Sequence, residues 1–390
     1  MSDAAERWAR SGMAHLTGDP HGPPDYSRAG ILGAADAAAA PFGVTPDALL
    51  AGRAGLTGTM RGGRIAVGGG SRLVRCRDSW CVFTLARQND LDSVAALLMA
   101  DGPIADPWDA LVAAAPDWDA ADLVDRGQML EIPCAVLGSA EVEAMVVTRT
   151  WPTRAPVPID AELLVVDLSA MWAGPLCGQL LRGLGATVIK VESPNRPDGA
   201  RSGNPDFFEW MNGGKVQFSS EISGGSAALA GLLDEADVVI EASRPRALEQ
   251  AGLDASTRSV RPGRVWVRIT GYGTSESMRH RVAFGDDAAV AGGLVGIDAA
   301  GPVFCGDAIA DPLTGLEAAA AVVESLAGGG GEIIDVAMAG VAAKYAAVPT
   351  IESGFDAEAV RPARPRIASI PTRVVDSEWI QHLIDVRRDR

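Results

Sequence analysis

Residues 163–168 read LLVVDL, an almost wholly apolar run with the length of one buried strand. Helical spacing follows over residues 177–184, and a second apolar strand, TVIKVE, is predicted at 187–192. Further strands of the same kind are predicted at three places: 237–241, 265–270 and 332–337. Apolar strands that alternate with helices are typical of a parallel sheet covered on both faces. The sequence therefore predicts an α/β fold with a doubly wound, mainly parallel sheet, as in Rossmann-like domains.

Length and composition indicate more than one domain. The chain has 390 residues, of which 47% are hydrophobic and 22% charged, so it can bury a core. The proline-rich segment WPTRAPVP predicts a linker at residues 151–159. Before it, residues 1–150 predict a smaller α+β domain with N-terminal helices. After it, we expect the large α/β domain at 160–350 and a C-terminal tail and helix at 351–390.

Charge and cysteine content argue against several classes of function. The 34 basic and 50 acidic side chains give a formal net charge of −16, which disfavours nucleic acid and anionic membranes as partners. The five cysteines form no CxxC pair and the four histidines are far apart, so no disulfide framework and no metal site are expected. We see no apolar run that could span a membrane and no secretory signal, which predicts a cytoplasmic protein. The preference for arginine over lysine indicates a GC-rich bacterial source.

Gly183 and Gly185, followed by Glu192, invite comparison with a dinucleotide-binding fingerprint. That fingerprint requires its glycines between the first strand and the first helix. The corresponding turn, at residues 167–175, contains one glycine here. The sequence also lacks the phosphate-loop, zincin and serine-hydrolase motifs. Nicotinamide binding and these other chemistries are therefore not expected.

A series of short motifs occurs in one order between residues 160 and 345. It opens with VDLS at 166–169, continues with LGATVIKVE at 184–192 and closes with IADPLTG at 309–315. The motifs between these are PDGAR at 197–201, NGGK at 212–215, ADVVIE at 236–241, ALEQAGL at 247–253 and ITGYG at 269–273. The ordered series resembles the family III CoA-transferases. That family includes the formyl-CoA and carnitine CoA-transferases and the related α-methylacyl-CoA racemases.

The resemblance implies an acyl-CoA:carboxylate CoA-transferase whose catalytic residue is Asp311. In the family, the aspartate of this motif attacks the acyl-CoA thioester to form an aspartyl anhydride, and CoA then converts the anhydride to an aspartyl-CoA thioester. The acceptor acid finally collects the CoA. A carboxylate suits this role because it is ionised at neutral pH without a base. We expect Asp311, which precedes Pro312, at a helix N-terminus that keeps it ionised, with an N-cap as its alternative or additional role.

The resemblance also implies contacts for the substrates, which are coenzyme A and acyl-CoA; no permanently bound cofactor is expected. Positions matching the family's CoA contacts are Trp172, Ala173, Arg201, Lys215 and Arg244. Gly292 and Gly293 match a small-residue pair near the acyl site. Surface salt bridges for the arginines and ordinary helix packing for the glycines are the alternative interpretations.

Two other functions remain open. A racemase or lyase on the same fold would need a histidine where this chain has Phe284, so proton transfer is disfavoured. A non-catalytic acyl-CoA-binding relative is the second alternative. It is favoured by the domain order, because segments similar to the family's small domain, such as 130–137, precede the large domain here. Family members interlock as dimers, so a homodimer is expected.

The sequence also contains a short internal similarity. Residues 11–23, SGMAHLTGDPHGP, are similar to residues 291–302, AGGLVGIDAAGP, and an alanine-rich helix is predicted after each. Short segments rich in glycine and alanine match readily, so a true repeat and a chance likeness both remain open.

Overall fold

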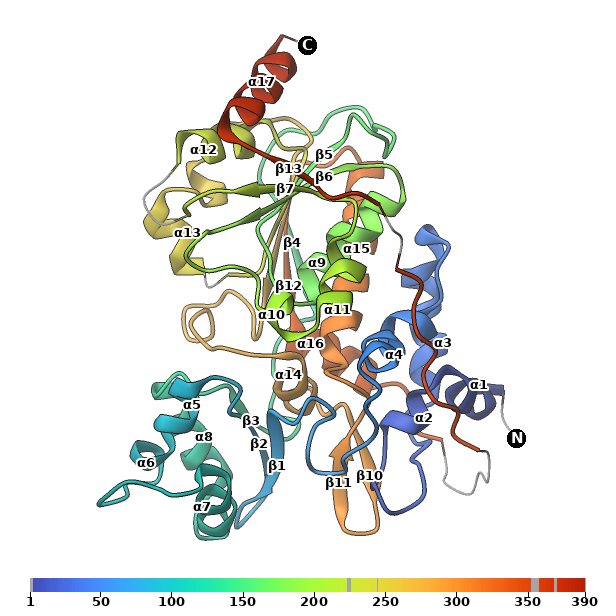
Figure 1. The fold of residues 1–390 in the computed structure, drawn as a ribbon, viewed down its shortest axis with the longest axis vertical. Coiled ribbons are helices and arrows are strands. Elements are labelled where there is room, and N and C mark those ends of the chain that lie inside the picture. The colour runs from blue at the N-terminus through green and yellow to red at the C-terminus, as the bar shows by residue number, and fades with distance from the viewer. Residues whose placement is uncertain (1–2, 223–225, 244, 352–357, 368–369, 390) are drawn as a thin grey trace.

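A computed structural model describes residues 3–222, 226–243, 245–351, 358–367 and 370–389 (Figure 1). Its main feature is an eight-stranded sheet in the order β13-β7-β6-β5-β8-β9-β12-β4. All neighbouring strands are parallel except β12 and β4, which are antiparallel. The strands are β4 (Met145–Arg149), β5 (Leu164–Asp167), β6 (Thr187–Glu192), β7 (Val216–Ser219), β8 (Val238–Glu241), β9 (Val265–Thr270), β12 (Glu332–Ala337) and β13 (Arg373–Val375). The predicted α/β fold with a mainly parallel sheet is confirmed.

The two faces of this sheet are covered by different helices, as the apolar strands predict. Leu164 and Val166 belong to one buried core, while Val165 between them belongs to another, because successive side chains point to opposite faces. The first core is closed by α12 (Ala227–Glu235), α13 (Pro245–Ala251) and α17 (Ser377–Arg388). The helices on the second face include α9 (Ala173–Gly183), α11 (Pro205–Asn212), α15 (Ala310–Ala327) and α16 (Met338–Ala346).

The N-terminal helices pack on that second face. They are α1 (Asp3–Ser11), α2 (Met13–Leu16), α3 (Gly30–Ala39) and α4 (Pro46–Thr57). Their buried residues, such as Trp8 and Leu50, belong to the same core as Leu313 of α15. The range 1–150 therefore supplies four helices and the edge strand β4 to the layers around the large sheet. The domain boundaries remain predictions.

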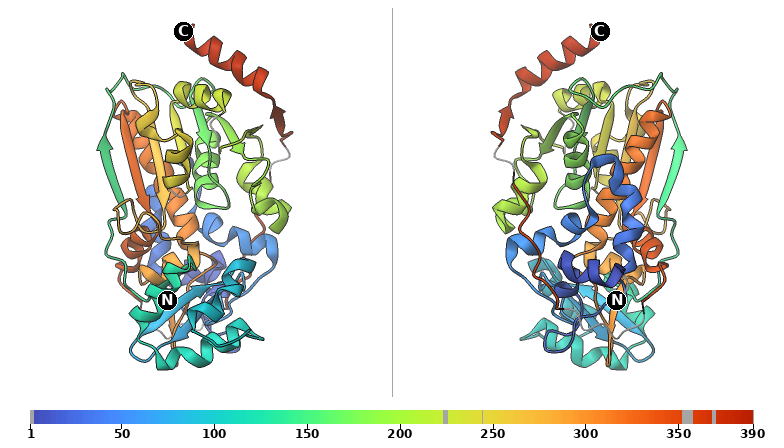
Figure 2. Two further views of the ribbon diagram at one scale, coloured as in Figure 1. Left: turned by 90° about the vertical axis from the view of Figure 1, so that its left-hand side faces the viewer. Right: turned by 90° about the vertical axis from the view of Figure 1, so that its right-hand side faces the viewer.

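A second, smaller sheet lies at the end of the molecule opposite α17 (Figures 1 and 2). It contains β1 (Ser71–Arg75), β2 (Trp80–Thr84) and β3 (Cys134–Val136), all antiparallel. Four helices enclose a separate core around it: α5 (Gln88–Asp92), α6 (Val94–Leu97), α7 (Pro107–Ala114) and α8 (Ala120–Met129). This unit contacts the large one through α14 (Gly285–Ala291), which packs against β2 and β3.

Each of the two similar sequence segments connects one helix to the next. In the N-terminal one, α1 and α2 lead through a turn closed by a Gly18–Pro24 bridge to α3. In the later one, α14 leads through the hairpin of β10 (Val295–Asp298) and β11 (Gly301–Phe304) to α15. No helix in the described part of the chain is both long and apolar enough to cross a membrane.

Candidate active site

Asp311 is the second residue of α15, and the loop before it has an unusual backbone. Gly306 and Ala308 have φ values of +69° and +45°, a region that alanine rarely adopts. The N-cap is Ile309, and no side chain caps the helix. The expected capping role of Asp311 is therefore wrong, because the N-cap position is two residues earlier, at Ile309, and Asp311 is already inside the helix.

A cluster of charged groups surrounds the Asp311 carboxyl. Desolvation raises its pKa to about 7, the Arg53 guanidinium opposes this, and Asp286 and Asp307 add to it. A pKa of about 7 leaves Asp311 partly protonated at neutral pH, where the sequence predicted an ionised side chain, because lost hydration and two neighbouring carboxylates outweigh Arg53 and the Gly285 N–H. When ionised, this carboxylate is more basic than an ordinary one, which favours nucleophilic attack.

Gly285 makes room for this carboxyl at the start of α14. A Cβ at Gly285 would lie 2.4 Å from Oδ2 of Asp311 and 2.4 Å from the carbonyl oxygen of Ala308. The backbone N–H of Gly285 donates to the Asp311 carboxylate and lowers its pKa. Glycine is the residue that allows both the approach and this hydrogen bond.

Two buried carboxyls of α14 accept hydrogen bonds from the unit that contains β1, β2 and β3. Asp286 accepts from the backbone N–H of Ala308 at 3.1 Å and from the Ser71 hydroxyl at 3.0 Å. Asp287 accepts from the backbone N–H of Phe284 at 2.8 Å and from the Thr84 hydroxyl at 3.2 Å. Desolvation raises the pKa of Asp286 to about 6 and that of Asp287 to about 8. Sequence reasoning considered this segment only for a missing histidine and overlooked its paired aspartates.

The turn of Trp172 and Ala173 lies at the N-terminus of α9, beside α15. A Cβ at Gly315, one turn after Asp311, would lie 2.5 Å from the carbonyl oxygen of Ala173, so the two helices are in close contact there. Met171 has a φ of +71°, a strained conformation of the kind that gathers at functional turns. Among the described residues, Nε1 of Trp172 and Oγ1 of Thr314 are buried polar atoms without a partner.

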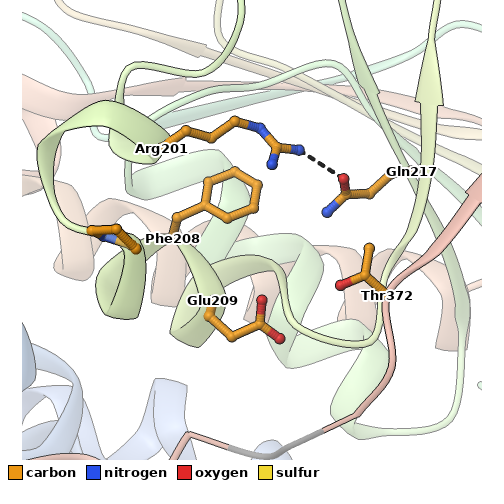
Figure 3. Close-up of a pocket in the computed structure, with 6 residues that line it drawn as sticks. Arg201, Phe208, Glu209, Gln217 and Thr372 are labelled. Atoms are coloured by element: carbon orange, nitrogen blue, oxygen red, sulfur yellow. Dashed lines mark hydrogen bonds between the residues drawn. The ribbon is translucent and has the colours of Figure 1, made fainter.

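Arg201 lies in α10 (Ala200–Gly203) and is accessible from a pocket (Figure 3). Its guanidinium donates to Glu192 and, at 2.7 Å, to Gln217, and it lies 3.9 Å from the centre of the Phe208 ring. The pocket has a volume of about 310 Å³ and is lined by Arg201, Pro205, Phe208, Glu209, Gln217 and Thr372. The salt-bridge interpretation of Arg201 therefore coexists with an open face toward the pocket.

Lys215 is fully buried and has all its donors in use. Its ammonium donates to Asp167 at 2.8 Å, to the carbonyl oxygen of Pro175 at 2.8 Å and to the side chain of Asn212 at 3.0 Å. Burial acts to raise the pKa of Asp167, but Lys215 and Lys190 hold it below its usual range. Since an ammonium has three N–H groups, this geometry gives Lys215 a structural partner at each of them.

Of the remaining predicted residues, the structure describes Gly292 and Gly293, and both take part in packing away from Asp311. Arg244 lies outside the described residues. Gly292 closes α14, and a Cβ there would lie 2.5 Å from the backbone nitrogen of Ala343 in α16. At the rise of an α-helix it is about 10 Å along the axis from Gly285. Gly293 accepts through its carbonyl from Arg28 at 3.0 Å, so both glycines take part in packing.

The structure is an α/β fold with a buried aspartate in the first turn of α15 and with an open pocket lined in part by Arg201. A profile of CoA-transferase family III matches residues 161–374, more than half of the chain. The chain belongs to CoA-transferase family III. No group of histidine, cysteine and acidic side chains in the described ranges could hold a metal ion.

The chain spans about half the length of the curated relatives it matches. It is 30% identical over 200 residues to succinyl-CoA–D-citramalate CoA-transferase of Chloroflexus aurantiacus, covering 47% of this chain and 50% of that one. It is 31% identical over 212 residues to succinate–glutarate CoA-transferase of Agrobacterium fabrum, covering 48% and 52%. A solved CAIB/BAIF family protein from Brucella suis shares 31% identity with a TM-score of 0.45, covering 49% and 56%.

Proposed function

We propose that this protein is an acyl-CoA:carboxylate CoA-transferase that works through Asp311. The observation that carries the proposal is the desolvated Asp311 carboxyl, which lies against Gly285 in the family-matched region. A carboxyl with a pKa of about 7 is both available as carboxylate and unusually basic. These are the properties that attack on a thioester requires.

In the proposed reaction, the Asp311 carboxylate attacks the thioester carbonyl of the donor and expels CoA as a thiolate, which gives a mixed anhydride. The thiolate attacks the aspartyl carbonyl and releases the donor acid, leaving Asp311 as a CoA thioester. The acceptor carboxylate displaces the thiolate to form a second anhydride. The thiolate then attacks the acceptor's acyl carbon, which yields the new acyl-CoA and restores the carboxylate. No proton has to be removed by a separate base.

We propose that CoA lies along the turn of Trp172 and Ala173 and reaches the pocket beside Arg201. The unpartnered Nε1 of Trp172 and the accessible guanidinium of Arg201 support this path. Arg244 stays a predicted contact, as do Lys215 and the pair Gly292 and Gly293, although the last three have structural partners already.

Trapping the covalent intermediate tests the proposal. Wild-type protein is incubated with acetyl-, propionyl- and succinyl-CoA and then with hydroxylamine, and the peptide containing Asp311 is analysed by mass spectrometry. We expect a hydroxamate at Asp311 and none in an Asp311→Asn variant. Saturable CoA binding without an adduct would instead indicate a non-catalytic binder. Exchange of the substrate's α-proton with deuterated water, without an adduct, would indicate a racemase.

We also propose a homodimer and a cytoplasmic location. The cytoplasmic proposal is supported by the cysteines, which are free and buried in the described structure. The dimer proposal rests on the family resemblance and is tested by light scattering at micromolar concentration. The expected mass is twice the 40.3 kDa of one chain, and a mass of 40.3 kDa would contradict it.

A further inference from the structure

Arg53 reaches the candidate site from α4, a helix that precedes the family-matched region. Its Nε donates to Asp307 at 2.8 Å, and its Nη2 donates to the second oxygen of the same carboxylate. The guanidinium lies 4.6 Å from the centre of the Trp172 ring and 5.8 Å from that of Phe207. One side chain thus contacts both the loop before Asp311 and the turn proposed to face CoA.

This pair is better enclosed than an ordinary surface salt bridge. The side chains of Arg53 and Asp307 are 23% and 2% exposed, and the contact is bidentate. The helix is also tightly docked, because a Cβ at Gly52 would lie 2.4 Å from the Trp210 ring and one at Gly55 would lie 2.2 Å from the carbonyl oxygen of Ala363. The position of Arg53 is therefore fixed from both sides.

The loop that Arg53 holds is strained. Gly306 and Ala308 have positive φ values on either side of Asp307, and this conformation persists only where the surroundings enforce it. Asp307 is held by Arg53, and the backbone N–H of Ala308 is held by Asp286. The two anchors come from α4 and α14, and the loop between them leads directly into Asp311.

Four charged groups from four elements face one another here. Asp286 comes from α14, Asp307 from the loop, Asp311 from α15 and Arg53 from α4, while the Ser71 hydroxyl of β1 donates to Asp286. Arg53 is the cation among these three carboxylates, and it acts on Asp311 through charge. Without Arg53, an ionised Asp311 would be the third negative charge in a desolvated site, and the positive charge that offsets it would be missing.

We infer that Arg53 is a positioning residue for Asp311, which holds the 306–308 loop through Asp307 and supplies the charge that allows Asp311 to ionise. The inference rests on the proposed function. If Arg53 has this role, α4 contributes to the candidate active site, although it lies outside the region that matches the family.

The test follows the ionisation of Asp311 by ¹³C NMR of carboxyl-labelled aspartate, with the signal assigned by its loss in Asp311→Asn. Arg53→Ala is expected to move the titration midpoint to higher pH by at least about one unit. Arg53→Lys, which keeps the charge, is expected to restore most of the midpoint. Arg64→Ala is the matched control, because Arg64 also pairs with an aspartate, at 2.6 Å, and lies over a tryptophan, with 27% side-chain exposure.

An unchanged midpoint in Arg53→Ala, or an equal shift in Arg64→Ala, would overturn the inference. If Arg53→Ala does not fold, Asp307→Asn decides the question, since loss of that negative charge is expected to lower the midpoint and no shift would contradict the cluster. The titration needs no acyl-CoA, so failure of the proposed transferase reaction is recognised separately, by the absence of an adduct on wild-type Asp311.

Discussion

A methyl carbon on Gly285 would lie 2.4 Å from Oδ2 of Asp311, closer than any real side-chain carbon approaches an oxygen. Gly285→Ala is therefore expected to displace the carboxylate and to reduce transfer at least about tenfold. Gly183→Ala is the matched control, because Gly183 is also helical and no atom lies within 4 Å of its Cβ position. Steady-state transfer rates of the two variants, with their melting temperatures, check this. Equal activity in both would contradict the close approach.

Asp311→Asn is expected to lose activity without losing stability. The carboxyl caps no helix, and it is a desolvated acid whose ionisation is unfavourable in the folded state. Transfer should fall below about a tenth of wild type, while the melting temperature at about pH 8 stays equal or rises. Thermal unfolding and transfer assays measure the two effects. A variant that retains more activity than this would rule out Asp311 as the nucleophile.

The rate of covalent modification of Asp311 is expected to rise with pH. Its pKa of about 7 means that the reactive carboxylate becomes the main form only above neutrality. Single-turnover labelling from about pH 5 to about pH 9 should follow one ionisation with a midpoint near this value. A rate that is flat down to pH 5 would show an ordinary, unperturbed carboxylate.

The free energy of unfolding is expected to fall as pH rises from about 4 to about 8. Asp286, Asp287 and Asp311 have folded-state pKa values of about 6, 8 and 7, so the native state binds more protons than the unfolded chain in this window. Their stabilising contribution is complete below pH 4 and is lost as each group ionises. Asp287→Asn should therefore make the slope shallower, as measured by denaturant unfolding at several pH values.

Asp298→Asn is the control for that slope. The Arg64 hydrogen bond helps to hold the pKa of Asp298 below its usual value, so its contribution is lost only at low pH. The slope above about pH 5 should be that of wild type. A slope altered equally by both substitutions would contradict a raised pKa of Asp287 as the cause of the pH dependence.

Lys215→Met is expected to destabilise the fold by about 3–5 kcal/mol, because it removes the direct salt-bridge partner of the buried Asp167 carboxylate. Lys344→Met, which removes a half-exposed lysine paired with Glu317, should cost less than about 1 kcal/mol. Denaturant unfolding compares the two, and adding Asp167→Asn should recover part of the larger loss. A stable Lys215→Met with weakened CoA affinity would instead support the predicted CoA contact.

The sheet could be predicted from the sequence because its signal is local. The run at 163–168 carries the side chains of both cores within one short segment, and it became β5. Asp311 and Trp172 were found through short motifs, which need no knowledge of the fold. Their environment was not found in this way, since a desolvated pKa depends on what surrounds the group.

Arg53 could not be predicted. It is 254 residues from Asp307, and no local pattern in α4 distinguishes a site arginine from a surface one. Lys215 shows the reverse problem, because a motif lysine that suggests a ligand contact is occupied by an interior carboxylate. In both cases tertiary packing decides which residue becomes the partner. The spacing of residues within a short motif carries no information about that packing.

β4 leaves the ribosome before any of the strands beside which it will lie. Its partner β12 is synthesised near the end of the chain, after β5, β6, β7, β8 and β9. Until then Met145–Arg149 is an unpaired strand, and even in the folded protein Val146 and Val147 are 45% and 51% exposed. Adjacent nascent chains on one polysome would present the same free edge to each other. The antiparallel edge of this sheet can therefore close only after β12 has been synthesised.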